Sequence, residues 1–189
     1  MDKEVVIQQA NELKNIMLST FKHDGSEESR LALLTATYSM FMDTLGIALD
    51  YNSQNTAYRF AKMMYLEKCS SLHSMPPELT VFPNKSTDEY VVIKDIPFTS
   101  ICSHHHVTFF GKAHIAYFPH EYILGLSKFG RVVQYFAAKP QIQEEMTAEI
   151  ANYLNDMIKP VGLVVKLEAE HLCMSTRGVK ISGSTTVTQ

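Results

Sequence analysis

YVVIKDIPFTSICSHHHVTFFGKAHIAYF, residues 90–118, carries the clearest strand signal in the chain. Three runs of β-branched or aromatic residues, each bounded by Pro, Gly or Asp, predict strands over 90–93, 98–101 and 113–118. A cysteine, a serine and three successive histidines, Cys102 to His106, stand between the second and third runs. The segment therefore predicts a sheet and sets candidate metal ligands beside one of its strands.

The chain before this segment is predicted to be helical. Apolar residues recur at helical spacing over 6–17 and 31–45, and a third helix is expected from about Asn55 to Cys69. Ser26 is a candidate N-cap for the second helix, because it precedes two glutamates suited to a first helical turn. The proline-rich stretch 70–86 is expected to be irregular.

The chain after this segment returns to helical spacing and then to strands. Two long helices are predicted over 126–138 and 142–158, separated by Pro140. Closing strands are predicted over 161–170 and 179–187. Helices, strands, helices and strands thus follow in separate runs, which is typical of an α+β fold with an antiparallel sheet.

Length and composition indicate one compact domain. The chain has 189 residues, 46% of them hydrophobic, which suffices for one sizeable core. We expect an N-terminal helical region over 1–70 and a region over 71–189 that contains the sheet within that domain. No apolar run is long enough for a membrane span or a signal peptide, so no membrane association and a cytoplasmic location are expected. A formal charge of −3 argues against nucleic acid as a partner, but a small anionic ligand remains compatible.

The cysteines and histidines predict a metal site. Cys102, His105 and Cys173 offer three ligands from two distant segments, and three protein ligands leave a fourth position for water, as in catalytic zinc sites. Cys102 and His105 can share a metal only if the chain turns between them. On a strand, His171 and Cys173 would share a face, which leaves His171 beside the metal as a base. Cys69 is expected to be an ordinary small apolar residue, and no disulfide is expected.

Two other interpretations of these residues stay open. A Cys-x-x-His pair is a weak signal by itself, and three successive histidines can form a polar strand end. A structural zinc site would need a fourth ligand, which His104 or His106 could supply.

Five motifs together resemble the GTP cyclohydrolase I family, in the order and at the spacing found there. The resemblance covers about residues 56–188. The motifs are Thr56–Lys62, Cys102–His105, Gly125–Arg131, Gln141–Glu144 and His171–Gly178. Each is weak alone, but all five in one chain are highly specific.

This resemblance implies a reaction, a fold and an assembly. Family members convert GTP and water to dihydroneopterin triphosphate and formate, and they form homodecamers of the tunnelling fold with sites between subunits. Zn²⁺ held by Cys102, His105 and Cys173 would activate the water that attacks C8 of guanine. His104 and His171 would transfer protons, although His171 could also serve only to orient a ligand.

The resemblance also implies substrate contacts. Glu144 would accept guanine N1–H and the exocyclic amine, with Gln143 assisting. The triphosphate would meet three cations of the same motifs, Lys128, Arg131 and Arg177, with the Ser127 hydroxyl, grouped here with the catalytic residues, adding a hydrogen bond. Arg59 and Lys62 look like a further phosphate pair that a neighbouring subunit supplies. Without the resemblance, a Gln-Glu or Arg-Lys pair on a helix is more typical of a solvated face.

The chain departs from the family at Ser103, which replaces a glutamate, at Ala57, which replaces a proline, and at Glu145, which replaces an arginine. Ser103 and Glu145 motivate a rival hypothesis, a protein of this fold that binds a purine or pterin without opening its ring. A zinc-dependent base deaminase is a second rival, but its Pro-Cys-x-x-Cys and His-x-Glu motifs do not occur in this sequence.

Overall fold

The computed structural model describes residues 2–20, 24–85 and 89–189. Contacts within the chain divide it into two compact units, Met1–Tyr65 and Leu66–Gln189, where the sequence predicts one domain with a helical part up to residue 70. Among the described residues, no helix combines the length and the apolar character that a bilayer span requires.

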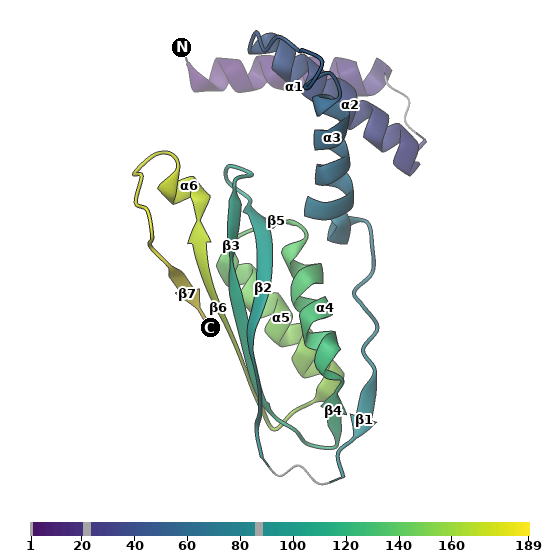
Figure 1. The fold of residues 1–189 in the computed structure, drawn as a ribbon. Coiled ribbons are helices and arrows are strands. Elements are labelled where there is room, and N and C mark those ends of the chain that lie inside the picture. Colours follow the sequence, from purple (N-terminus) through teal and green to yellow (C-terminus); the bar gives the residue numbers. More distant parts are fainter. Residues whose placement is uncertain (1, 21–23, 86–88) are drawn as a thin grey trace. The chain divides into compact units, whose positions relative to one another are not determined.

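The N-terminal unit is helical, as predicted. Its helices are α1 (Lys3–Thr20), α2 (Glu27–Thr44) and α3 (Thr56–Met63), labelled in Figure 1. Ser26 caps α2, and its hydroxyl accepts a hydrogen bond from the backbone N–H of Ser29 at 3.2 Å. The third helix is regular only as far as Met63, because the chain then forms a π-helical turn (Met64–Lys68) and a short 3₁₀ helix (Ser70–Leu72).

Packing within the N-terminal unit is unequal. Tyr38 of α2 stacks on Phe60 of α3 with ring centroids 3.8 Å apart. In contrast, α1 buries none of its side chains, and apolar residues such as Leu13 and Ile16 are more than half exposed. A helix of this length gains most of its stability from packing, so α1 has little to hold it within one chain.

The C-terminal unit is built on a five-stranded sheet with the order β5-β2-β3-β6-β7. Its strands are β2 (Val91–Cys102), β3 (Thr108–Phe118), β5 (Pro140–Gln141), β6 (Gly162–His171) and β7 (Thr186–Thr188). All pairs are antiparallel except the short pair of β5 with β2. A separate two-stranded sheet joins β1 (Val81–Pro83) to β4 (Tyr122–Leu124).

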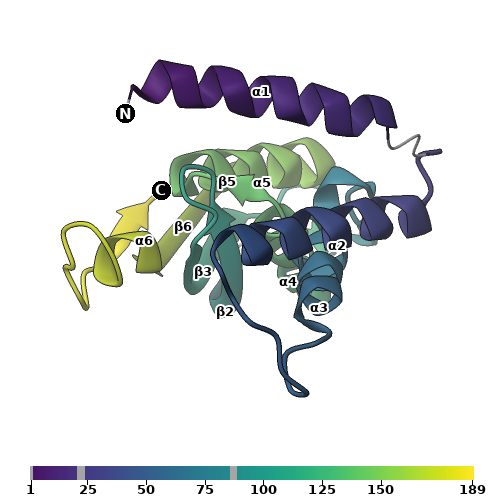
Figure 2. The same cartoon turned by 90° about the horizontal axis from the view of Figure 1, so that it is seen from above.

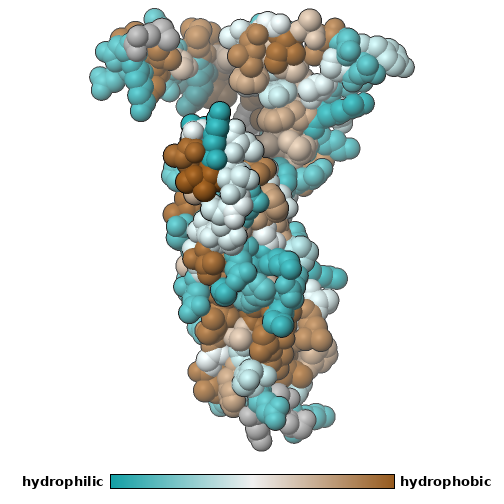
Figure 3. Space-filling view, turned by 60° about the vertical axis from the view of Figure 1, so that its left-hand side comes forward, coloured by the Kyte–Doolittle hydropathy of each residue, from teal (hydrophilic) through white to brown (hydrophobic). Residues whose placement is uncertain are grey.

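Two helices, α4 (Leu126–Ala137) and α5 (Gln143–Ile158), cover one face of this sheet (Figures 1 and 2). Alternation along β3 explains the core, since Phe109, Ala113 and Ile115 point inward and are fully buried. On the other face, Phe110 is 42% exposed and Val164 is 48% exposed. Seen from that side, the C-terminal unit carries hydrophobic patches above and below a hydrophilic band (Figure 3).

The structure corrects several predicted strands. The runs 90–93 and 98–101 belong to one strand, β2, whose register shifts between Ile93 and Ile96, where Asp95 has a φ of 60°. The predicted strand 179–187 is extended only at Thr186–Thr188, because the residues before it form turns. The strands β1, β4 and β5 lie where the sequence predicts loops or a break.

Candidate active site

Cys102 and His105 lie at a turn that ends β2, as their spacing requires. The backbone N–H of Cys102 donates to Val107 O at 2.9 Å, and that of His106 donates to Cys102 O at 2.9 Å. These bonds close the turn, and His106 adopts a positive φ of 51° within it. The Cys102 Sγ and His105 Nδ1 atoms thereby come within 3.7 Å.

His171 and Cys173 do not share a strand face, so that prediction was wrong. β6 ends at His171, and the chain turns at once into the short helix α6 (Leu172–Ser175). The His171 ring stacks on Phe109 of the neighbouring strand, with centroids 4.7 Å apart and planes 5° apart. Cys173, from the helical turn, reaches Cys102 and His105.

The ligand atoms of Cys102, His105 and Cys173 all lie within 4.8 Å of one another. Two sulfurs and one imidazole nitrogen form a soft donor set that suits zinc, and they leave a fourth position. Neither His104 nor His106 joins this group in the part of the chain that the structure describes. Burial, with the neighbouring Cys102, raises the pKa of the Cys173 thiol, so metal binding there must displace a proton.

Arg177 also lies at this group. Its Nη1 atom is 2.6 Å from His105 Nε2. Because a guanidinium only donates, Nε2 is the acceptor in this contact, and the neutral ring then carries its hydrogen on Nδ1. A metal bound to Nδ1 requires the hydrogen on Nε2 instead. Nε2 could then no longer accept from Arg177, so binding a metal through Nδ1 would break this contact.

A pocket of about 370 Å³ borders the group. Among the residues that line it are Cys102, His104, Gln141, Glu144, His171 and Cys173. The predicted proton carriers and the predicted guanine ligand Glu144 thus share one pocket with two of the candidate metal ligands. Glu144 is exposed at the start of α5, where its carboxylate can accept hydrogen bonds from a ligand.

His171 is half-buried and hydrogen-bonded to Gln143. Its Nε2 atom lies 2.8 Å from Gln143 Oε1. Burial lowers the pKa of His171 below its ordinary value, although the carboxylate of Glu144 raises it in part. The imidazole is therefore neutral near pH 7 and able to accept a proton.

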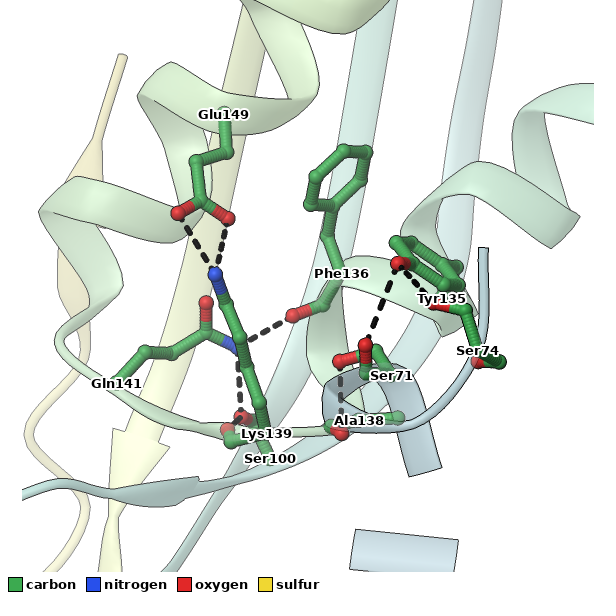
Figure 4. A network of polar contacts seen from close by, with 9 residues as sticks. All are labelled: Ser71, Ser74, Ser100, Tyr135, Phe136, Ala138, Lys139, Gln141 and Glu149. Carbon is green, nitrogen blue, oxygen red and sulfur yellow. Dashed lines mark hydrogen bonds and ion pairs between the residues drawn. The ribbon is translucent and has the colours of Figure 1, made fainter. Parts of the chain in front are cut away.

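A polar network holds the backbone beside Cys102 (Figure 4). β5 pairs Gln141 with Cys102, and the buried Gln141 amide donates to Ser100 Oγ and to Phe136 O. Ser100 in turn donates to Lys139 O at 3.2 Å. These bonds fix the end of β2 against the connection between α4 and α5, from which Gln143 and Glu144 emerge.

Three residues predicted to contact phosphate or ribose do not lie with the candidate metal ligands of the same chain. Ser127 and Lys128 lie in the first turn of α4, next to β4, and Arg131 lies one turn further. The candidate metal ligands lie at the opposite end of the sheet, at the end of β2 and in α6 (Figure 1). Lys128 Nζ instead donates to Glu78 O at 3.0 Å.

Arg59 and Lys62 lie on α3, in the N-terminal unit, and both are exposed. Their predicted contact with phosphate stays a prediction.

Sequence reasoning missed the residues that support the site. Phe109, Gln141, Thr147 and Thr188 contact or anchor its residues. The alternation of side chains along β3 could have indicated that Phe109 faces the core. No local pattern could have indicated the contact of Thr147 with Thr188, because these residues are far apart in the chain.

Comparison with known proteins yields consistent matches. A family model described as GTP cyclohydrolase I matches residues 34–189. The GTP cyclohydrolase 1 of Streptococcus agalactiae serotype Ia is 45% identical over 151 residues, which cover 78% of this chain and 80% of that protein. That of Lysinibacillus sphaericus is 43% identical over 166 residues, which cover 85% of this chain and 87% of that protein.

Among solved structures, the archaeosine synthase QueF-Like in the apo form is similar with a TM-score of 0.39 and 15% identity, over 55% of this chain and 94% of that chain.

Proposed function

Because this chain belongs to the GTP cyclohydrolase I family, we propose that it opens the imidazole ring of GTP by a zinc-dependent hydrolysis and closes the product to 7,8-dihydroneopterin triphosphate, releasing formate. The observation that carries this proposal is the convergence of Cys102, His105 and Cys173 at a pocket that also holds His104, His171 and Glu144.

Zinc is the proposed metal. The two thiols and one imidazole match the usual ligands of this ion. When bound with one position open, zinc lowers the pKa of water to about 7 and so supplies a hydroxide for attack on C8.

His171 and His104 are the proposed proton carriers. Burial keeps the pKa of His171 low, so the ring is neutral near pH 7 and available as a base during the reaction. His104 lies on the exposed turn beside the metal ligands and lines the same pocket. Two imidazoles on one pocket could take up the proton that the attacking water loses, pass it to the departing ring nitrogen and serve the later rearrangement in turn.

Glu144 is the proposed guanine anchor. One carboxylate accepts two adjacent donors at once, and N1–H and the exocyclic amine of guanine are such a pair. Arg177, close to His105, is the proposed phosphate ligand nearest the candidate metal group in the same chain. Lys128, Arg131, Arg59 and Lys62 would complete the triphosphate site.

We further propose the tunnelling fold and an oligomer, a decamer by family resemblance, whose sites lie between subunits. Three features support this. Ser127 and Lys128 lie at the end of the C-terminal unit away from the metal ligands, so a second copy must bring them near. The helix α1 is unburied, and the face of the sheet opposite α4 and α5 carries exposed Phe110 and Val164.

The first experiment incubates zinc-loaded protein with GTP and follows formate together with the fluorescence of the oxidised pterin. We expect both products from the parent protein and neither from His171→Ala. Tight GTP binding without either product would refute the proposed reaction and favour the non-catalytic binder that Ser103 motivates.

A second experiment tests shared sites by mixing subunits. His171→Ala and Lys128→Ala variants are each expected to be nearly inactive. After dissociation and joint reassembly, some interfaces combine an intact His171 with an intact Lys128 from the other copy, and activity should return. A mixture of His171→Ala with Cys173→Ser is the control, because both changes fall on the same side of the interface. Recovery in the control, or in neither mixture, would contradict sites between subunits.

A further inference from the structure

Gln143 has an unusual environment for a substrate ligand. It is the first residue of α5 and is only 1% exposed. Its Nε2 atom lies 3.2 Å from Leu167 O, 3.1 Å from Thr186 O and 3.1 Å from Thr188 Oγ1. Its Oε1 atom lies 2.8 Å from His171 Nε2. All of the polar atoms of this amide are therefore engaged within the protein.

The surrounding carbonyls fix the orientation of the amide. Leu167 O and Thr186 O can only accept hydrogen bonds, so the NH₂ group must face them. The reverse orientation would place the amide oxygen against two carbonyl oxygens and leave the NH₂ group toward His171. Oε1 therefore faces the imidazole, independently of how the ring is protonated.

Two threonines complete the arrangement around Gln143. Thr147 Oγ1 donates to the backbone carbonyl of Gln143 at 2.8 Å, so its oxygen is left to accept. Thr188 Oγ1, 2.6 Å away, then donates to Thr147, and it is the third acceptor among which Gln143 Nε2 shares its two hydrogens. The ring of bonds ties α5 to β7 and holds the amide still.

We propose that Gln143 is a positioning residue that holds His171 in the tautomer with hydrogen on Nε2 and leaves Nδ1 as the proton acceptor, an inference that rests on the proposed function. Gln143 Oε1 only accepts, so the neutral ring must donate from Nε2. Phe109, stacked on the ring with planes 5° apart, fixes the plane in which Nδ1 points. The sequence prediction assigned Gln143 to guanine instead. Contact with guanine would require this amide to abandon buried partners.

The tautomer can be observed directly. Neutron diffraction from deuterium-exchanged crystals at about pH 8, where imidazole is neutral, distinguishes the two ring nitrogens. We expect a deuteron on Nε2 and none on Nδ1 of His171. A deuteron on Nδ1 would overturn the proposal. This measurement needs no variant and does not depend on turnover.

Kinetics test whether Gln143 acts through His171. Gln143→Met keeps the side-chain length but removes the acceptor, and we expect kcat to fall about 100-fold, as when an orienting partner of a catalytic group is lost. In the His171→Ala background, where turnover is removed, Gln143→Met should leave the GTP dissociation constant within about two-fold. A GTP affinity about ten-fold weaker in that background would show that Gln143 binds guanine and would overturn the proposal.

Gln134→Met is the matched control, since Gln134 Nε2 also donates to a backbone carbonyl, Pro97 O at 2.6 Å, but on α4 away from His171. It should keep the parent kcat. If Gln143→Met does not fold, as circular dichroism would show, the neutron map of the parent protein still decides the tautomer. If the parent protein forms no pterin, the proposed function fails, whereas the tautomer and the GTP affinities still test the role of Gln143.

Discussion

Replacing Gly111 with alanine should separate the two strands that bring His171 to Phe109. Gly111 lies in β3 opposite Ala169 of β6, and a methyl group on it would lie 1.9 Å from Glu168 O. Ordinary contact begins at 3.4 Å, so the strands must part by about 1.5 Å (3.4 − 1.9). A ladder hydrogen bond does not survive such a displacement.

The cost follows from these contacts. Overpacking of a tight site costs about 1–3 kcal/mol, and each lost ladder bond adds about 1 kcal/mol. Alanine also lowers the conformational entropy of the unfolded chain, which stabilises the folded state by up to about 1 kcal/mol. We therefore expect Gly111→Ala to lower the free energy of unfolding by about 3 kcal/mol, and kcat to fall because His171 pairs with Phe109 two residues away.

Urea unfolding followed by circular dichroism, at a fixed protomer concentration, measures this change. Gly130→Ala is the control, since a methyl group there meets nothing within 4 Å and the residue lies inside α4. That variant should be up to about 1 kcal/mol more stable than the parent. The reasoning fails if Gly111→Ala unfolds within about 0.5 kcal/mol of the parent protein.

Three further perturbations have defined outcomes. Burial lowers the pKa of His171 from its ordinary value of 6.5, so the acid limb of the pH profile of kcat/KM should lie below pH 6.5. An acid limb at or above pH 6.5 would argue against His171 as the base. Because the pKa of His171 is lower in the folded state than in the unfolded state, the unfolded state binds this proton more readily. His171 should therefore lower the free energy of unfolding as the pH falls below 6.5. Arg177→Ala should tighten zinc binding about five-fold, because Arg177 favours the His105 tautomer that cannot bind a metal through Nδ1. Competition with a chromogenic chelator measures the zinc affinity. Unchanged or weaker binding would count against this role of Arg177. Gln141→Leu should cost about 1–3 kcal/mol in the same urea assay, because Phe136 O and Ser100 lose a donor, and an unchanged midpoint would contradict the network of Figure 4.

Local signals in the sequence were enough for the main elements. Helical spacing predicted α4 and α5, and the pattern Ser26-Glu27-Glu28 predicted the cap of α2. The spacing of Cys102 and His105 required a turn, which the structure confirms. Each of these depends on residues within a few positions of one another.

Features set by distant contacts were not predictable in this way. β5 is extended because its two residues pair with the end of β2, and nothing in Pro140-Gln141 alone indicates a strand. The two runs predicted as separate strands form one strand with an irregularity at Asp95, whose φ is positive. Only their common pairing with β3 shows that they are continuous. Likewise, the role of Thr188 depends on Gln143, and the helical turn at Cys173 replaces the extended chain that spacing favoured.

The placement of the candidate metal ligands predicts an effect of the metal on the lifetime of the protein in a cell. A metal bound there would link the end of β2 to the single helical turn of α6, and that turn is only partly buried. A metal at about 100 times its dissociation constant would add about 2.7 kcal/mol to the folded state. Local opening of α6, and cleavage by proteases that attack open chains, should therefore become more frequent when the proposed metal is scarce. Metal supply would then set the abundance of the enzyme as well as its turnover.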